Sequence, residues 1–376
     1  MVLILKKLIF ALCLLCAILL PGMGVYAAEV SAESAIVYEP RTGMVLFEKD
    51  ADARRLVAST TKIMTALVVL EHCDLGETVT ATAAQAATEG SAMYLQPGED
   101  YTVEDLLYGL MLASGNDAAA ALAEHCAGSM EAFAALMNEK CAELGLANTH
   151  FVNAHGLDAE EHFSSARDLA LITAAAMENA DFCRIFSSRS YTCKEQTYVN
   201  HNKLLGSCDG CIGGKTGYTN AAGRVLVSCA EREGMRLICV TVSDPQDWND
   251  HAALYDECFG AYRYVPLPGS GWERISLISG TKGHAALCCD APGVLLPKEA
   301  ELHLTVHLPR FIFAPTVYGG AVGSVDVEIG GERQSYALSL AESVPLDPTA
   351  PLTAWEQFKR AWFTANRYPG IYLRSY

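Results

Sequence analysis

Three short groups of residues in the sequence could together carry out nucleophilic catalysis. They are, in chain order, Ser59-Thr60-Thr61-Lys62, Ser114-Gly115-Asn116 and Lys215-Thr216-Gly217. A serine hydroxyl is a poor nucleophile until a neighbouring base takes its proton, and a lysine can be that base only when its pKa is lowered. Residues three apart on a helix lie on one face, so Lys62 can reach the hydroxyl of Ser59. The pattern therefore favours acyl transfer through a serine nucleophile.

Each group taken alone has a simpler explanation. Ser59 could cap a helix, with Lys62 on its solvated face, and Asn116 could cap the helix that follows it. Lys215 could lie exposed on a glycine-rich turn. The three groups in this order favour catalysis, and Lys215 would supply a second positive charge of the kind that lowers the pKa of Lys62. The small residues around Lys215 would also let a substrate backbone lie alongside as an added strand.

Residue periodicity predicts the elements that position these groups. Between Thr60 and His72 apolar residues recur at helical spacing without Gly or Pro, which places Ser59 at or near a helix N-terminus. The other elements predicted in this part are helices over 103–113, 117–126, 130–144 and about 165–177, and strands over 35–38, 44–47, 224–229 and 236–243. Beyond about Tyr264, alternating runs such as 301–307 and 324–329 predict a small all-β domain. The expected fold class is α+β.

The two ends of the chain predict export and membrane contact. The first 28 residues combine Lys6-Lys7, an apolar block and small residues at the end, which is typical of a signal peptide; an uncleaved anchor is the alternative. Either places the rest of the chain outside the cytoplasm. In the tail, 351–376, the apolar residues of 352–363 share one helical face beside Lys359 and Arg360, which suits a membrane interface. A helix docked on the β domain is the alternative. We expect a protein peripheral on the outer face of the cytoplasmic membrane.

Composition restricts the remaining functions. The net charge of -17 argues against nucleic-acid binding. Of fourteen cysteines, Cys13 and Cys16 leave with the signal peptide. We expect most of the others to be small apolar residues with free thiols; one or two disulfides are the next alternative, and a metal site the last. A zinc site would need a second ligand pair like Cys208 and Cys211. No metal and no cofactor is expected.

The chain resembles the low-molecular-weight penicillin-binding proteins, serine-type D-Ala-D-Ala carboxypeptidases of the penicillin-binding protein 5 and DacF kind, peptidase family S11. The likeness is close from about residue 34 to 250 and includes, besides the three groups, the stretches 54–65, 112–118, 153–158, 165–169 and 200–205. It implies a β-lactamase/transpeptidase-like catalytic domain over 29–264, with an antiparallel sheet and a helical block. The β-rich domain then covers 265–350 and the tail 351–376.

The resemblance also implies a role for each site residue. Ser59 would attack the penultimate D-Ala carbonyl, Lys62 would take its proton, and Ser114 would pass a proton to the departing D-Ala. Backbone N–H groups of Ser59 and Tyr218 would form the oxyanion hole. The residues expected to bind substrate, through the peptide amide and the terminal carboxylate, are Asn116, Lys215, Thr216, Gly217 and Tyr218.

The activity so implied is removal of the terminal D-Ala from peptidoglycan stem pentapeptides through an acyl-enzyme, with penicillins and other β-lactams as covalent inhibitors. One alternative is a non-catalytic sensor of penicillin or peptidoglycan. Another is a class A-like β-lactamase, whose deacylating glutamate would be Glu160 or Glu161. His155 and Asp168 are expected to be structural.

Overall fold

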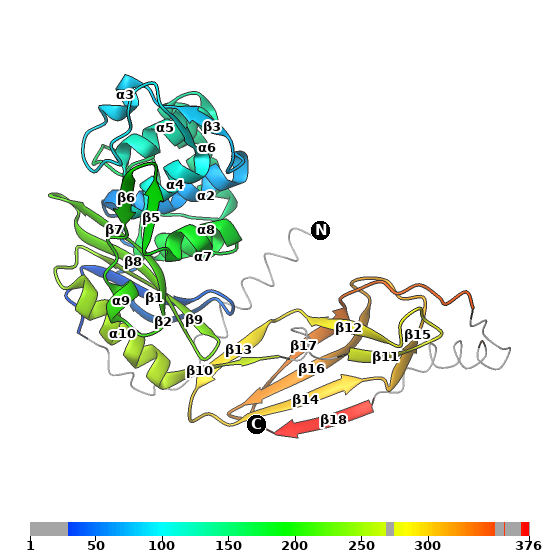
Figure 1. The fold of residues 1–376 in the computed structure, drawn as a ribbon. Coiled ribbons are helices and arrows are strands. Elements are labelled where there is room, and N and C mark those ends of the chain that lie inside the picture. The colour runs from blue at the N-terminus through cyan, green and yellow to red at the C-terminus, as the bar shows by residue number, and fades with distance from the viewer. Residues whose placement is uncertain (1–28, 268–273, 350–356, 358–369, 376) are drawn as a thin grey trace.

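The computed structural model describes residues 29–267, 274–349, 357 and 370–375. The predicted signal peptide, 1–28, lies outside the described residues, as does most of the tail. Figure 1 shows a sheet covered by a block of helices and, to one side, a second part built from strands. The α+β fold class predicted from the sequence is confirmed.

The first sheet is antiparallel and has the strand order β2-β1-β9-β8-β7. All four predicted strands are confirmed with small shifts at their ends, as β1 (Ser34–Glu39), β2 (Met44–Lys49), β8 (Gly223–Arg232) and β9 (Met235–Val242). The fifth strand, β7 (Cys211–Thr219), carries Lys215 and forms one edge of the sheet. An edge strand has one side free of ladder partners, so the Lys215 group lies on a strand that another chain can extend.

The predicted helices are also confirmed within a few residues. They are α2 (Lys62–His72), α4 (Val103–Leu112), α5 (Asn116–Ala127), α6 (Met130–Glu143) and α7 (Ala166–Ala176). Four further helices were not predicted, α3 (Ala83–Ala86), α8 (Ala180–Ser187), α9 (Leu204–Ser207) and α10 (Asp247–Ala261). Two small two-stranded sheets complete this part, β3 (Thr78–Thr80) with β4 (Asp100–Thr102) and β5 (Ser190–Cys193) with β6 (Gln196–Val199).

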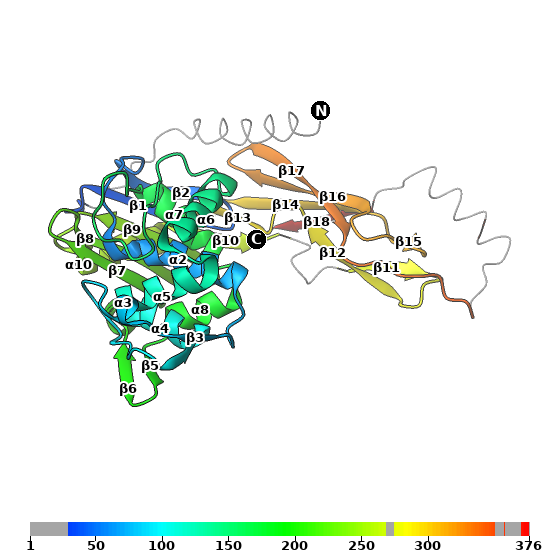
Figure 2. The same ribbon diagram turned by 90° about the horizontal axis from the view of Figure 1, so that it is seen from above.

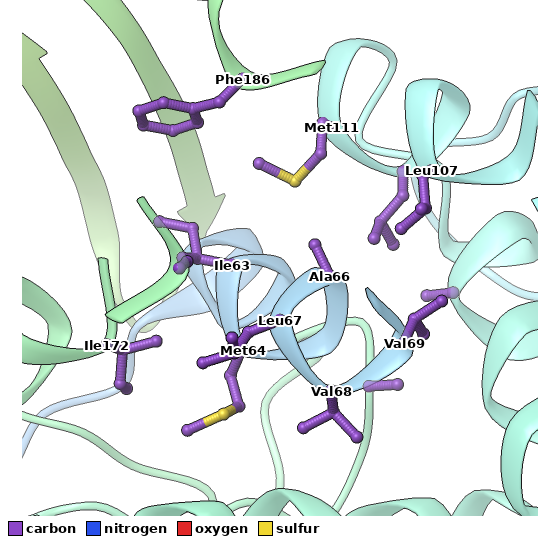
Figure 3. Close-up of a cluster of buried hydrophobic side chains, with 14 of the residues drawn as sticks. Ile63, Met64, Ala66, Leu67, Val68, Val69, Leu107, Met111, Ile172 and Phe186 are labelled. Atoms are coloured by element: carbon purple, nitrogen blue, oxygen red, sulfur yellow. The ribbon is translucent and has the colours of Figure 1, made fainter. Parts of the chain in front are cut away.

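Helix α2 is the centre of the helical block. It is apolar around most of its circumference, and every residue from 62 to 69 is buried, which is typical of a helix enclosed by others. Figure 3 shows Leu107 and Met111 of α4, Ile172 of α7 and Phe186 of α8 packed around it. Lys62 is the first residue of this helix and is fully buried. Its side-chain amine therefore lies in the protein interior rather than in water.

The second part contains a seven-stranded sheet with a separate hydrophobic core. Its strands, in spatial order, are β15 (Phe311–Phe313), β11 (Arg274–Ile278), β12 (His284–Cys289), β17 (Glu332–Leu340), β16 (Ala321–Ile329), β14 (Leu302–Leu308) and β18 (Gly370–Ser375). Figure 2 shows this sheet extending away from the helical block. Strand β10 (Tyr262–Pro266), which follows α10, pairs with β13 (Gly293–Pro297) and links the two parts.

Strand β18 differs from the expectation for the tail. Six residues of the 351–376 segment pair with β14 at the edge of the sheet, so they extend the β-rich part. The amphipathic helix expected over 352–363 lies outside the described residues, apart from Gln357, which is helical. Among the helices that the structure describes, none is long and apolar enough to cross a membrane.

The twelve cysteines of the described chain all carry free thiols. Five are buried and seven are partly buried. Burial is complete for fewer than half of these residues, so the expectation that most of them are small buried apolar side chains stays a prediction.

Candidate active site

The side chain of Lys62 connects two of the three groups found in the sequence. Its Nζ lies 3.0 Å from Ser59 Oγ and 2.7 Å from Asn116 Oδ1, and it donates to the carbonyl oxygen of His155 at 2.6 Å. The carbonyl and the amide oxygen can only accept hydrogen bonds. A neutral lysine amine has two N–H groups and one lone pair, so these two acceptors leave the lone pair for the hydroxyl of Ser59.

Ser114 and Lys215 form the second half of the site. Lys215 Nζ lies 3.0 Å from Ser114 Oγ and 2.9 Å from the carbonyl oxygen of Thr216. Lys215 is 1 % exposed and Ser114 is 4 % exposed, whereas Ser59 is partly open to solvent. The three groups therefore converge on one place, with the serine hydroxyl of the first group reachable from outside.

Burial changes the acid–base properties of both lysines. It lowers the pKa of Lys62 well below its ordinary value, and the positive charge of Lys215 lowers it further, while Asp117 has a smaller opposite effect. Burial also lowers the pKa of Lys215, to about 7. Two independent causes therefore disfavour the charged form of Lys62 and favour the neutral amine that a general base requires.

The loop before α5 is fixed by hydrogen bonds of Asn116 and Asp117. The amide nitrogen of Asn116 donates to the Glu89 carbonyl at 2.6 Å, which turns its amide oxygen toward Lys62. The carboxylate of Asp117 accepts from the backbone N–H of Met93 at 2.9 Å and of Leu95 at 3.1 Å. These contacts tie the Ser114 group to the 89–95 loop, and they involve two buried side chains.

Unusual backbone conformations hold both serines. Ala58, next to Ser59, has φ +46°, and Ser114 has φ +58°, in the left-handed region that few non-glycine residues occupy. Ser59 lies in a short 3-10 helix (Ala58–Thr61) just before α2. A Cβ on Gly156 would lie 2.0 Å from the Ala58 carbonyl oxygen, so the loop after His155 presses directly on this turn.

The remaining predicted site residues lie on β7 beside the serine turn. A Cβ on Gly217 would be 3.0 Å from the backbone nitrogen of Ser59, a tight contact, so glycine lets the strand approach the serine turn closely. Thr216 is partly buried, and Tyr218 is 64 % exposed with its hydroxyl 3.1 Å from Asn220 Oδ1. The structure therefore brings all eight predicted residues into one neighbourhood, formed by the 3-10 helix, α2, the loop before α5, the start of α5 and β7, with Tyr218 at its open side.

The backbone of His155 is a site feature that the sequence did not predict. Its carbonyl accepts from Lys62, and burial together with the charge of Lys62 lowers the pKa of its imidazole to about 4. A carbonyl has no residue-type signature, so no sequence pattern could have identified it. Asp168 lies at the start of α7, where it accepts from the Asn148 N–H and the Thr149 hydroxyl, in agreement with a structural role.

His162 is a second unpredicted neighbour of the serine turn. Its Nδ1 accepts from the backbone N–H of Val152 at 3.3 Å, so its Nε2 carries the proton and donates to Thr61 Oγ1 at 2.9 Å. It is 2 % exposed, and burial lowers its pKa to about 4. The neutral ring thus anchors the first turn. The adjacent Glu160 and Glu161, considered for a β-lactamase, are both exposed.

Comparison with known proteins gives matches over most of the chain. The family model described as D-alanyl-D-alanine carboxypeptidase, Peptidase_S11, matches residues 22–246. The D-alanyl-D-alanine carboxypeptidase DacF of Bacillus subtilis is 34% identical over 88% of this chain and 87% of its own length. DacC of Escherichia coli is 34% identical over 82% of each chain. Among solved structures, penicillin binding protein 5 of Haemophilus influenzae has a TM-score of 0.69 at 28% identity and covers 86% of this chain and 100% of its own.

Proposed function

Because the chain belongs to the D-alanyl-D-alanine carboxypeptidases of peptidase family S11 and is a serine-type D,D-carboxypeptidase, we propose that Ser59 is its nucleophile and Lys62 its general base. The substrate of this activity is the D-Ala-D-Ala end of a peptidoglycan stem peptide, and penicillins are its covalent inhibitors. The similar proteins give no support to the sensor or the β-lactamase as alternatives.

The observation that carries this proposal is the set of contacts of Lys62. Two acceptors, Asn116 Oδ1 and the His155 carbonyl, take the two N–H bonds of the neutral amine. The lone pair then faces Ser59 Oγ at 3.0 Å, within reach for proton transfer. The proton of the Ser59 hydroxyl moves to Lys62 as the oxygen bonds to the penultimate D-Ala carbonyl carbon.

The second half of the site would complete the acylation. The C–N bond to the terminal D-Ala breaks, and the departing amine takes a proton through Ser114, whose hydroxyl lies 3.0 Å from Lys215. Lys215 and Thr216 would bind the terminal carboxylate, a charge-assisted contact. The backbone N–H groups of Ser59 and Tyr218 would stabilise the oxyanion. The close approach of Gly217 to the Ser59 nitrogen supports this pairing.

Edge strand β7 gives the substrate a place to bind. Its partner β8 occupies one side, and the substrate backbone would lie on the other as an added strand, between β7 and the loop that holds Ser114 and Asn116. Water would then attack the acyl-enzyme ester and release Ser59, with Lys62 as base again.

The proposed division of the chain assigns the catalytic domain to 29–264, the β-rich domain to 265–350 and the tail to 351–376. Separate hydrophobic cores in the two parts support a boundary near 264, which falls inside β10. The enzyme acts outside the cytoplasm, on cell-wall peptide. We extend this to a position on the outer face of the cytoplasmic membrane, held by the tail.

Replacement of Ser59 tests the assignment of the nucleophile. We expect the wild-type protein to be labelled covalently by a fluorescent penicillin and to release D-Ala from a D-Ala-D-Ala-ended muropeptide. Ser59→Ala should lose both, because no oxygen remains to form the ester. Ser187→Ala, which changes an exposed serine at the end of α8, should retain both. Penicillin labelling of Ser59→Ala at the wild-type rate would assign the nucleophile elsewhere.

A further inference from the structure

A cluster of potential metal ligands lies at the opposite end of α2 from the active site. The Sγ of Cys73, a carboxylate oxygen of Glu77 and a ring nitrogen of His125 all lie within 4.8 Å of one another. Cys73 comes eleven positions after Lys62 along α2, a distance of about 16 Å at 1.5 Å per residue. The cluster is therefore separate from the catalytic site.

Three secondary-structure ends bring these side chains together. Cys73 is the C-cap of α2, where its N–H donates to the Val69 carbonyl at 2.9 Å. His125 lies in the last turn of α5, and Glu77 precedes β3. Figure 1 shows α2, α5 and β3 within the same helical block. Because two helix C-termini meet here, their partial negative charges favour a cation at this point.

The backbone and His125 already orient Glu77. Its Oε1 accepts from the Asp74 N–H at 2.6 Å, and its Oε2 lies 2.8 Å from His125 Nε2. A carboxylate held by a backbone hydrogen bond and pointed at a histidine is the kind of supported ligand seen in metal sites. Cys73 and His125 are partly buried and Glu77 is exposed, so an ion could enter from solvent.

The chemistry of the donors fits zinc better than magnesium or calcium. Thiolate, imidazole and carboxylate are the ligand types of Zn²⁺, whereas the two harder cations take oxygen. Tetrahedral zinc with ordinary bond lengths requires ligand atoms about 3.4 to 3.8 Å apart. The three ligand atoms already lie within 4.8 Å of one another, so small side-chain rotations would bring them to that spacing.

A fourth ligand is available nearby. The thiol of Cys126, the residue after His125, interacts with the thiol of Cys73. We propose that Cys73, Glu77 and His125 bind a zinc-type divalent cation, with Cys126 or a water in the fourth position, as a structural site that joins the ends of α2 and α5. The active-site residues Lys62 and Asn116 begin these same two helices.

Cobalt titration tests the proposal directly. The reduced, metal-free mature protein should bind one equivalent of Co²⁺ alone and show a thiolate-to-cobalt absorption in the near ultraviolet with tetrahedral bands in the visible. Zn²⁺ should then displace the cobalt and abolish these bands. Zinc should also raise the midpoint of thermal unfolding, since an ion that binds only the folded state stabilises it.

Three variants make the result specific. Cys73→Ser and His125→Gln should lose the cobalt bands and the zinc-dependent rise in the unfolding midpoint. Cys208→Ser, which changes another partly buried cysteine, should retain both. Circular dichroism of each metal-free variant confirms that it is folded.

Several outcomes would overturn the proposal. One is a reduced wild-type protein that gives no cobalt–thiolate band. A second is equal loss in Cys208→Ser and Cys73→Ser. A third is a Cys73–Cys126 disulfide in the isolated protein together with no metal binding after reduction, which would assign the pair to a cross-link. Ser59→Ala should bind the metal normally, so failure of this proposal and failure of the catalytic assignment are distinguishable.

Discussion

At the scale of single residues, the two active-site lysines have different tasks because their surroundings differ. Lys62 contacts two oxygen acceptors and a hydroxyl, a set that suits a neutral amine acting as base. Lys215 contacts Ser114 and the carbonyl of Thr216 from the edge strand, where it can meet a carboxylate. The positive charge of Lys215 also lowers the pKa of Lys62, because a second cation close to the first is unfavourable.

The alkaline side of the pH profile should therefore belong to Lys215. Burial lowers its pKa to about 7 in the free enzyme, so its positive charge is lost as the pH rises through that value. Since only the cation attracts the substrate carboxylate, kcat/KM for a D-Ala-D-Ala-ended peptide should fall as the pH rises above about 7. Lys215→Arg should lower the maximum by about tenfold but keep the rate level to higher pH, because a guanidinium stays charged.

The control for this measurement is Lys203→Arg, which makes the same lysine-to-arginine substitution at an exposed position. It should leave the profile of kcat/KM unchanged. If the alkaline fall persisted in Lys215→Arg at the same pH, a group other than Lys215 would be responsible for it.

At the scale of elements, the sequence predicts the helices better than it predicts the contacts between them. The apolar residues of α2 predicted the helix, and the three-residue spacing from Ser59 to Lys62 predicted that Lys62 can contact the Ser59 hydroxyl. Both predictions depend only on local spacing. Strand β7 was harder to predict, since Gly213 and Gly214 lower strand propensity. The structure explains these glycines, because a Cβ on Gly213 would meet the Phe186 ring at 2.2 Å and a Cβ on Gly214 would meet the Asn202 side chain at 2.3 Å.

Contacts between distant segments left no signal in the sequence. The carbonyl of His155 reaches Lys62 from 93 residues away, and it is a backbone group that any residue could supply. The proposed metal ligands were missed for a related reason. Glu77 and His125 are 48 residues apart, and only the packing of α5 against α2 and β3 brings them together. A search for closely spaced pairs such as Cys208 and Cys211 could not detect them.

The loop after His155 should be essential for the geometry of the serine turn. Gly156 has φ +87°, and a Cβ there would lie 2.0 Å from the Ala58 carbonyl oxygen. Gly156→Ala should therefore destabilise the protein by about 3 kcal/mol or more, through combined backbone strain and overlap. We also expect the rate of acylation by penicillin to fall at least about tenfold as the turn that carries Ser59 shifts.

Gly145 is the matched control, because it has φ +70° but nothing within 4 Å of the added Cβ. Gly145→Ala should show the backbone strain alone. It should lower the free energy of unfolding in urea by about 1 kcal/mol and leave the rate of acylation unchanged. Equal effects of the two substitutions on acylation would mean that the contact with Ala58 does not position Ser59.

At the scale of the whole molecule, the catalytic part and the β-rich part have separate cores, and the tail returns to the second sheet through β18. Residues 370–375 pair with β14, so the chain that follows the predicted membrane segment, 352–363, belongs to the β-rich part. If its apolar face lies in a membrane, the β-rich part is held near the surface. The active site belongs to the other part, where its edge strand can meet the cell-wall peptide.

Substitution within the tail tests this arrangement without removing β18. Trp355 and Trp362 are seven residues apart in the sequence, so they would share the apolar face of the helix predicted over 352–363. The double variant Trp355→Glu and Trp362→Glu should bind anionic phosphatidylglycerol vesicles at least about tenfold more weakly, because it loses apolar area and adds negative charge to an acidic protein. Vesicle sedimentation at 0.15 M salt measures this partition, and penicillin acylation should stay unchanged.

The matched control places two glutamates on an exposed apolar pair of the β-rich part, Val317 and Tyr318, which are 71% and 69% exposed. Because this control adds the same charge, a general electrostatic repulsion from the vesicles would weaken both variants equally. Selective loss in the tail variant would support contact through the tail. Selective loss in the Val317 and Tyr318 variant would instead place the membrane contact on the β-rich part and contradict the role proposed for residues 352–363.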